Sequence, residues 1–240
     1  MNKTNLAFGQ ISDRGAPPPE PKFREVELST PDDLPIVDLI ELYAGIEYAL
    51  PSDQGLIVQF VTATSGLGSE QVALDMAWAG TSVLGKRMLL LYCTKSAHRL
   101  IDASQPGSGG AASDSDMHAN AFDNDIAKVA GQQLYLADWR GWHSDTGALV
   151  GGDVIDGHLD ELRNFFDMVI MVAPPADVDP LATILARYAD GNVIVLEAEQ
   201  TRRAAAIRLR EVLARSGSPI VGTILNNRRN YLPRWLARLL

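Results

Sequence analysis

The sequence predicts a three-layer α/β domain with a mostly parallel central sheet and helices on both faces. Short apolar runs bounded by turn residues recur along the chain, beginning with Leu56–Val61 and Met88–Tyr92. Segments with helical spacing of apolar residues separate these runs, and this alternation is typical of parallel strands joined by crossover helices. A length of 240 residues with 46% hydrophobic composition is sufficient for one well-buried domain of this class.

The domain is expected to span residues 34–240. Residues 1–33 are polar and proline-rich, and we interpret them as a flexible arm that cannot bury enough apolar area to offset its ordering entropy. The first predicted helix covers about residues 34–50, where apolar residues recur at helical spacing. A buried strand at 56–61, a loop at 62–68 and a helix from about 69 to 84 follow.

The second apolar run precedes a segment of unusual composition. Residues 102–121 are rich in Gly, Ser, Ala and Asp, and we expect them to form a long, mobile surface loop. The later predicted elements are a strand at 133–136, a helix at 153–164, a strand at 168–172, a helix at 178–188, a strand at 193–196, a helix at 201–215 and a strand at 220–225.

Composition excludes several classes of protein. No run approaches the roughly 20 apolar residues that span a bilayer, and the N-terminus has no apolar core of signal-peptide length. The single cysteine, Cys93, rules out an internal disulfide framework and a cysteine-based zinc cluster, and the four histidines are scattered. We therefore expect a cytoplasmic protein without a bound metal.

The net charge of −9 is unevenly distributed along the chain. Residues 1–200 hold 12 Lys/Arg and 29 Asp/Glu, a net of −17, whereas residues 201–240 hold nine Arg and only Glu211, a net of +8. An acidic body argues against nucleic acid binding by the whole domain, while a basic end permits contact with an anionic surface.

The last residues have the pattern of a short basic amphipathic helix. Its apolar positions and the arginines beside them are Leu232, Trp235, Leu236, Leu239 and Leu240 with Arg228, Arg229, Arg234 and Arg238. Three interpretations are open: the helix lies on the inner membrane leaflet, it docks on a partner, or it packs on its own domain. Trp139 and Trp142 likewise indicate either a binding surface or a packed patch.

The loop after the first predicted strand, TATSGLGSEQ, occupies the place of a phosphate-binding loop. It contains Gly66 and Gly68, but Ser69 and Glu70 stand where a functional loop has a lysine followed by Ser or Thr. Glu70 can satisfy the helix dipole itself and would repel a triphosphate.

From about residue 36 onward, the chain resembles the cytoplasmic domain of bacterial tyrosine kinases of exopolysaccharide machinery, within the wider class of partition-type and septum-site P-loop ATPases. The resemblance is carried by Gly85-Lys86-Arg87 before an aliphatic strand, Phe166-Asp167 through Pro174-Pro175, Ile220 through Asn226, and the ending from Tyr231 to Leu236. It implies a P-loop NTPase-like fold.

The same resemblance indicates the positions at which the functional residues of the family are replaced by others. It implies the phosphate-loop lysine at Ser69, the magnesium-binding hydroxyl at Glu70, two aspartates at Tyr92 and Thr94, and a further aspartate at Val172. Asn226, near the adenine in the family, is kept. Asp177 and Asp179 either replace a lost carboxylate or cap the following helix, with capping the more common role of such residues.

From these departures we expect a non-catalytic pseudokinase or pseudo-ATPase, not an enzyme and without a cofactor, whose stability Mg-ATP does not raise. It would act in exopolysaccharide synthesis or export by binding an inner-membrane co-polymerase or chain-length protein, which would hold it at the inner face of the membrane. The sequence leaves open whether it forms homo-oligomers. One alternative is an ATPase or tyrosine kinase completed in trans by an arginine such as Arg202 or Arg203. Another is a membrane-surface positioning protein.

Overall fold

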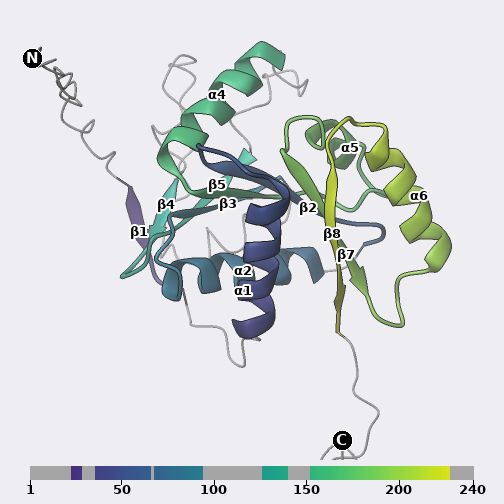
Figure 1. The fold of residues 1–240 in the computed structure, drawn as a ribbon, viewed down its shortest axis with the longest axis horizontal. Coiled ribbons are helices and arrows are strands. Elements are labelled where there is room, and N and C mark those ends of the chain that lie inside the picture. Colours follow the sequence, from purple (N-terminus) through teal and green to yellow (C-terminus); the bar gives the residue numbers. More distant parts are fainter. Residues whose placement is uncertain (1–22, 29–35, 66–67, 94–125, 140–151, 228–240) are drawn as a thin grey trace, which may run out of the picture.

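The computed structural model describes residues 23–28, 36–65, 68–93, 126–139 and 152–227. These residues form a central sheet of eight strands covered by helices on both faces (Figure 1). In the part of the chain that is described, no helix is both long enough and apolar enough to cross a bilayer.

The strands of the sheet are arranged in the order β1-β4-β5-β3-β6-β2-β7-β8. Their bounds are Arg24–Val26 (β1), Leu56–Thr62 (β2), Met88–Tyr92 (β3), Ala127–Val129 (β4), Leu134–Asp138 (β5), Met168–Val172 (β6), Gly191–Glu197 (β7) and Ile220–Asn226 (β8). Neighbouring strands are parallel except for β4 and β5, which are antiparallel. The prediction of a mostly parallel sheet is therefore confirmed.

The helices divide between the two faces of the sheet (Figure 1). Their bounds are Ile36–Ala49 (α1), Gly68–Ser82 (α2), Gly152–Phe165 (α4), Leu181–Leu185 (α5) and Arg203–Ala214 (α6). Alternate residues of β2 show the division: Val58 and Phe60 pack in a core with α1 and α2, whereas Ile57 packs with α4 and Val61 with α6. Every residue of β2 is buried, as expected of a strand covered on both faces.

At the amino end of the central strands, side-chain carboxylates accept hydrogen bonds from backbone N–H groups. The Asp190 carboxylate accepts a hydrogen bond from the backbone N–H of Ile57 at 2.8 Å and also binds the Arg163 guanidinium. Asp167 accepts from the backbone N–H of Arg87 at 2.7 Å. These acids join neighbouring segments where the strands begin, so they have structural roles.

The interpretation of residues 1–33 as a flexible arm needs correction at one point. Residues 24–26 form β1, which pairs in parallel with β4, and Val26 is buried in the core. The apolar side chains of Phe23 and Val26 make this short pairing favourable, because Phe23 packs its ring against Tyr135 at a centroid distance of 4.9 Å. The rest of the predicted arm and the predicted loop at 102–121 lie outside the described residues.

Two further differences concern element bounds. The helix predicted at 178–188 is only five residues long, because Asp179 and Pro180 hold a turn before it and its last residues form turns. The strand predicted at 133–136 extends to Asp138, since β5 remains paired with β3 up to Tyr92. This second difference affects the candidate site, because Asp138 is an acid at the carboxyl end of the sheet.

Candidate functional site at the carboxyl end of the sheet

The carboxyl ends of the parallel strands bring together residues that are far apart in the sequence. The last residues of β2, β3, β5, β6, β7 and β8 are Thr62, Tyr92, Asp138, Val172, Glu197 and Asn226. Ligands of open α/β sheets bind at this end of the strands. Three of these residues, Tyr92, Val172 and Asn226, are positions that the sequence marked as functional, and they thus lie at the end of the sheet where a ligand is expected.

The structure describes the residues before and after the middle of the candidate phosphate loop, up to Ser65 and again from Gly68. Thr62 ends β2, and its hydroxyl oxygen is buried with no hydrogen-bond partner within the described residues. Gly68 begins α2, followed by the buried Ser69 and by Glu70 in the first turn. Helix α2 therefore starts where the N-terminus of a phosphate-binding helix would lie. Gly66 lies outside the described residues.

Gly68 is closely surrounded by the ends of two other strands. A Cβ atom added to Gly68 would lie 3.0 Å from Glu197 Oε1 and 3.3 Å from Asn226 Nδ2. Glu197 and Asn226 are neighbours in the register of β7 and β8. Asn226 thus lies beside the start of α2, at the position where the resemblance placed the adenine side, but with a carboxylate next to it.

The predicted acidic positions occupy the centre of the sheet end. Val172 and Tyr92 are buried neighbours in the register of β6 and β3, and Thr94 lies outside the described residues. Burial raises the pKa of Tyr92, and the nearby charge of Glu70 raises it further. The Tyr92 hydroxyl therefore stays protonated in the folded protein, and neither it nor Val172 can replace a carboxylate as a metal ligand.

Sequence reasoning missed two acids at this end of the sheet, Glu197 of β7 and Asp138 of β5. Asp138 is the register partner of Tyr92, and its charge, after burial, contributes to raising the pKa of the Cys93 thiol. An acid directly after the apolar run 134–137 was the available signal, but the strand was expected to end at residue 136. The buried, protonated thiol of Cys93 is consistent with a packing role.

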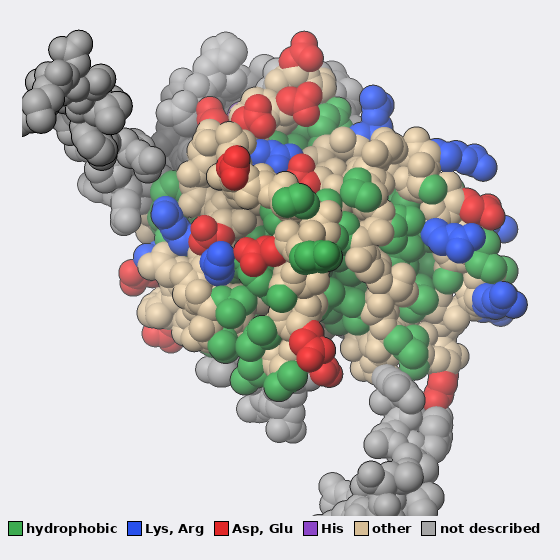
Figure 2. Space-filling model, viewed as in Figure 1, with side chains coloured by type: hydrophobic (Ala, Val, Ile, Leu, Met, Phe, Trp, Pro, Cys, Tyr) green, Lys and Arg blue, Asp and Glu red, His purple; other side chains and the backbone are tan. Residues whose placement is uncertain are grey.

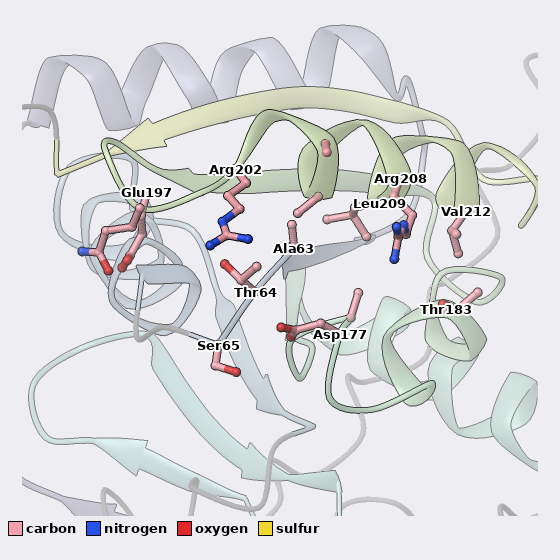
Figure 3. Close-up of a pocket in the computed structure, with 14 residues that line it drawn as sticks. Ala63, Thr64, Ser65, Asp177, Thr183, Glu197, Arg202, Arg208, Leu209 and Val212 are labelled. Carbon is pink, nitrogen blue, oxygen red and sulfur yellow. The ribbon is translucent and has the colours of Figure 1, made fainter.

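A cavity of about 820 Å³ opens beside the phosphate-loop position (Figure 3). It is bounded by Ala63, Thr64 and Ser65 after β2, by the loop after β6 with Asp177, and by the first turns of α6. Arg202 and Arg208 point into it from the α6 side, and the Arg202 guanidinium is directed toward Thr64 (Figure 3). This volume is in the range of small-molecule sites.

The charges in this cavity are unpaired within the described residues. Neither Arg202 nor Arg208 has a carboxylate within ion-pair distance among the described acids. Of the two candidate aspartates, Asp179 accepts a hydrogen bond from the first N–H of α5, Leu181, at 2.9 Å, whereas Asp177 lines the cavity. The helix-capping interpretation therefore fits Asp179, and Asp177 is left as an acid facing the cavity.

The other predicted contact residues are only partly within the described part of the chain. Trp139 is only 2% exposed and packs in the core with α4, so of the two interpretations it fits the packed patch and not a binding surface. Trp142 lies outside the described residues. All five candidates for membrane or partner contact also lie outside the described residues: Arg228, Arg229, Arg234, Trp235 and Arg238. Groups of three or more potential metal-ligating side chains do not occur among the described residues.

Comparison with known proteins identifies relatives for one part of the chain. No family model matches it. A segment of 79 residues is 32% identical to the tyrosine-protein kinase CpsD of Streptococcus agalactiae, covering 33% of this chain and 34% of the relative. The chain therefore aligns with about a third of the length of this curated relative.

Solved structures extend the similarity to the fold. The kinase domain of the Escherichia coli tyrosine kinase ETK matches with a TM-score of 0.58 and 14% identity, covering 82% of this chain and 78% of the domain. The cell division ATPase MinD of Pyrococcus furiosus matches with a TM-score of 0.54 and 18% identity, covering 77% and 78%. These matches confirm the P-loop NTPase-like fold.

The relatives also correct one expectation from the sequence. We expected that this chain is not an enzyme, because lysine and carboxylates are missing from the expected positions. That prediction was wrong by the evidence of its relatives, which are named tyrosine-protein kinases and are therefore enzymes.

Proposed function

We propose, starting from the relatedness of this chain to bacterial tyrosine kinases, that it is a nucleotide-using enzyme of exopolysaccharide synthesis whose phosphate site takes its cation from Arg202. The observation that carries this proposal is the Arg202 guanidinium, which has no ion-pair partner among the described residues and is directed toward Thr64 in the cavity beside the start of α2. A phosphate group needs such a cation together with hydroxyl and backbone donors.

The described residues fit a phosphate group in several respects. Thr64 and Ser65 line the cavity, and the N-terminus of α2 lies next to it along the chain. The buried hydroxyl of Thr62, which has no hydrogen-bond partner within the described part of the chain, lies there too. A bound nucleotide would supply the phosphoryl group. Asp177 and the hydroxyl of Ser65 offer hard oxygen atoms of the kind that Mg²⁺ prefers.

The proposal differs in one respect from the alternative considered from the sequence. In that alternative, an arginine of a neighbouring subunit completes the site, whereas here Arg202 acts within its own chain. The proximity of Arg202 to residues 63–65 supports a site completed in cis, because β7 ends next to β2 and delivers the start of α6 to the phosphate loop.

A finer part of the proposal concerns regulation and partners. The resemblance to exopolysaccharide kinases supports a regulatory role at the inner face of the membrane, through an inner-membrane chain-length or co-polymerase protein. Nucleotide binding at the loop beside α2 would then alter that association. Affinity capture of the full-length protein from its host, with and without Mg-ATP, tests this part: recovery of such a membrane protein is expected, and its absence in both states contradicts it.

The central experiment measures thermal unfolding of the full chain with Mg-ATP. A ligand at ten times its dissociation constant stabilises the folded state by about 1.4 kcal/mol, which for a chain of this size is a rise in Tm of about 3–6 °C. We expect Arg202→Ala to abolish the rise and the neighbouring Arg203→Ala, whose side chain is exposed and does not line the cavity, to retain it.

Turnover is measured on the same three proteins, as release of phosphate and as transfer of labelled phosphate to tyrosine. Turnover by the wild type and by Arg203→Ala, with loss in Arg202→Ala, is the expected pattern. The proposal is abandoned if millimolar Mg-ATP leaves the wild-type Tm unchanged, or if Arg202→Ala responds to ATP like the wild type.

A further inference from the structure

Strand β8 forms one edge of the sheet, and within the described residues it pairs only with β7. A strand with a single neighbour presents a row of unpaired N–H and C=O groups along its other side. None of the seven residues of β8 is buried, whereas every residue of β2, β3 and β6 is. As far as the described residues extend, the outer side of β8 is therefore open to a further strand.

The composition of β8 favours pairing with another strand. Its sequence, IVGTILN, contains no charged residue and no proline, and four of its seven residues are β-branched. Leu225 is 55% exposed, and the space-filling view shows hydrophobic side chains at the surface over β8, between α1 and α6 (Figure 2). Proteins usually protect a sheet edge with charges, prolines or a short strand, and β8 has none of these.

The opposite edge of the sheet is protected in the usual way. Strand β1 is only three residues long, and two of the three, Arg24 and Glu25, are charged. A short, charged strand gives a second strand little to pair with. The contrast singles out β8 as the edge at which the sheet can be extended.

The sequence of β8 suits a second copy of itself. In an antiparallel pair centred on Thr223, this residue faces its own equivalent, and Val221 faces Leu225 of the other copy. Thr–Thr pairs and pairs of apolar side chains stabilise neighbouring strands. A strand that carries charges would find no opposite charge on β8. The arrangement is isologous, as interfaces of two-fold dimers are.

The residues that follow β8 in the sequence are a less suitable occupant of this edge. Residues 228–240 contain four arginines and Pro233, which has no N–H to donate to a neighbouring strand. A second copy of β8 has neither obstacle, so the composition of the chain favours pairing between copies.

We propose that the protein forms a two-fold dimer in which β8 pairs with β8 of a second copy, antiparallel and centred on Thr223, so that one sheet runs through both copies. The surface is separate from the proposed phosphate site, since neither Thr223 nor Leu225 lines the cavity. Backbone hydrogen bonds and apolar contacts hold the dimer together. The net charge of −9 on each copy opposes association, so salt should not weaken it.

The test is sedimentation velocity of the full chain at up to about 200 µM, in about 50 mM and about 300 mM salt. We expect a dimer whose Kd does not rise with salt. Thr223→Lys places like charges opposite each other at the two-fold axis and should raise the Kd at least about fivefold. Val178→Lys makes the same change in charge at a residue that is 66% exposed and lies outside β8, and it should change the Kd by less than about twofold.

Crosslinking tests the register of the two strands. A short bis-maleimide should join two copies of Thr223→Cys, because opposite residues of antiparallel strands have Cβ atoms about 5 Å apart, and it should not join copies of Val178→Cys. The native Cys93 is buried and serves as the background in both.

Four results overturn the proposal. A monomer at about 200 µM would assign the edge to the chain's own residues or to a strand of another protein. Equal losses in the two lysine variants would show diffuse repulsion, a dimer that weakens with salt would show ion pairing, and a dimer without crosslinking at residue 223 would place the interface elsewhere. Circular dichroism melting of each variant checks its folding. The rise in Tm with Mg-ATP should persist in Thr223→Lys, so failure of the dimer and failure of the phosphate site are distinguished.

Discussion

Glu197 Oε1 lies 3.0 Å from the position that a Cβ atom would occupy on Gly68, so the end of β7 contacts the first residue of α2. Asn226 Nδ2 approaches the same position to 3.3 Å. The start of α2 is therefore enclosed by side chains from β7 and β8, and any phosphate that approaches this helix end lies close to the Glu197 carboxylate. This contact determines how the proposed site responds to substitution.

The first prediction is that Glu197→Gln strengthens binding of a phosphate ligand. Removing one negative charge lowers the repulsion of an anion at the start of α2, and unit charges near a protein surface interact by up to about 4 kcal/mol at 4 Å. Because Glu197 is partly exposed, we expect a reduction in Kd for Mg-ATP of only about 3- to 10-fold, measured by calorimetry. Glu211→Gln on α6 is the control and should leave Kd unchanged; an unchanged Kd in Glu197→Gln would refute the repulsion.

The second prediction contrasts two glycines. An added Cβ on Gly55 would lie 2.0 Å from the backbone oxygen of Phe166, whereas on Gly68 it would meet only side-chain atoms, of Glu197 and Asn226, that can rotate away. Gly55→Ala should therefore lower the free energy of unfolding by about 3 kcal/mol or more, as overpacking against backbone does, and Gly68→Ala by less than about 1 kcal/mol. Urea denaturation measures both values, and similar values for the two would contradict the prediction.

The third prediction concerns Asp190 at the amino end of the strands. Its carboxylate accepts from the buried N–H of Ile57 and pairs with Arg163, whose side chain is 18% exposed. Asp190→Ala removes the acceptor of the Ile57 N–H and leaves Arg163 with only the Gly55 carbonyl at 3.4 Å and Asp160 at 3.8 Å, so it should cost about 2–4 kcal/mol of unfolding free energy. Asp190→Asn keeps an acceptor for Ile57 and should cost roughly half as much.

A surface pair provides the comparison for Asp190. Lys86 and Glu47 lie 3.2 Å apart with both side chains more than a third exposed, so Lys86→Met should cost less than about 1 kcal/mol. If Lys86→Met destabilises the protein as much as Asp190→Ala does in the same urea experiment, burial does not determine the strength of these ion pairs.

The fourth prediction is a loss of stability at high pH. Burial raises the pKa of Tyr92 above its ordinary value of 10.0, and burial together with the hydrogen bond to Glu47 raises that of Tyr43. The unfolded chain therefore loses these protons from about pH 10 while the folded chain keeps them, so the contribution of both tyrosines to stability is full below pH 10 and declines above it. Chemical denaturation between pH 8 and pH 11 should show this decline.

Tyr92→Phe separates the contribution of one tyrosine to this profile. The variant cannot ionise at residue 92, so its stability should fall less steeply above pH 10 than that of the wild type. At pH 7 the two proteins should differ little, since the Tyr92 hydroxyl makes no hydrogen bond to any residue that the structure describes. Parallel pH profiles would show that Tyr92 ionises freely in the folded state and would contradict the direction of its pKa.

The amino-acid sequence by itself determined the fold class and the order of most elements. Strands such as β2 and β6 are buried on both faces, so they read as continuous apolar runs, and helices such as α1 retain a periodic apolar face. These signals are local, because the burial of a strand or helix determines which of its own residues are apolar. The place of the candidate phosphate loop was predicted from the same local pattern.

Only the tertiary structure decided which side chains meet. The short strands β1 and β4 have no periodic signal, and they form because pairing in the sheet satisfies their backbone groups. Asp138 neighbours Tyr92 through strand register, and Arg202 lines the same cavity as Thr64 because β7 pairs with β2. Such contacts depend on how distant segments pair, and no local pattern of residues encodes that pairing.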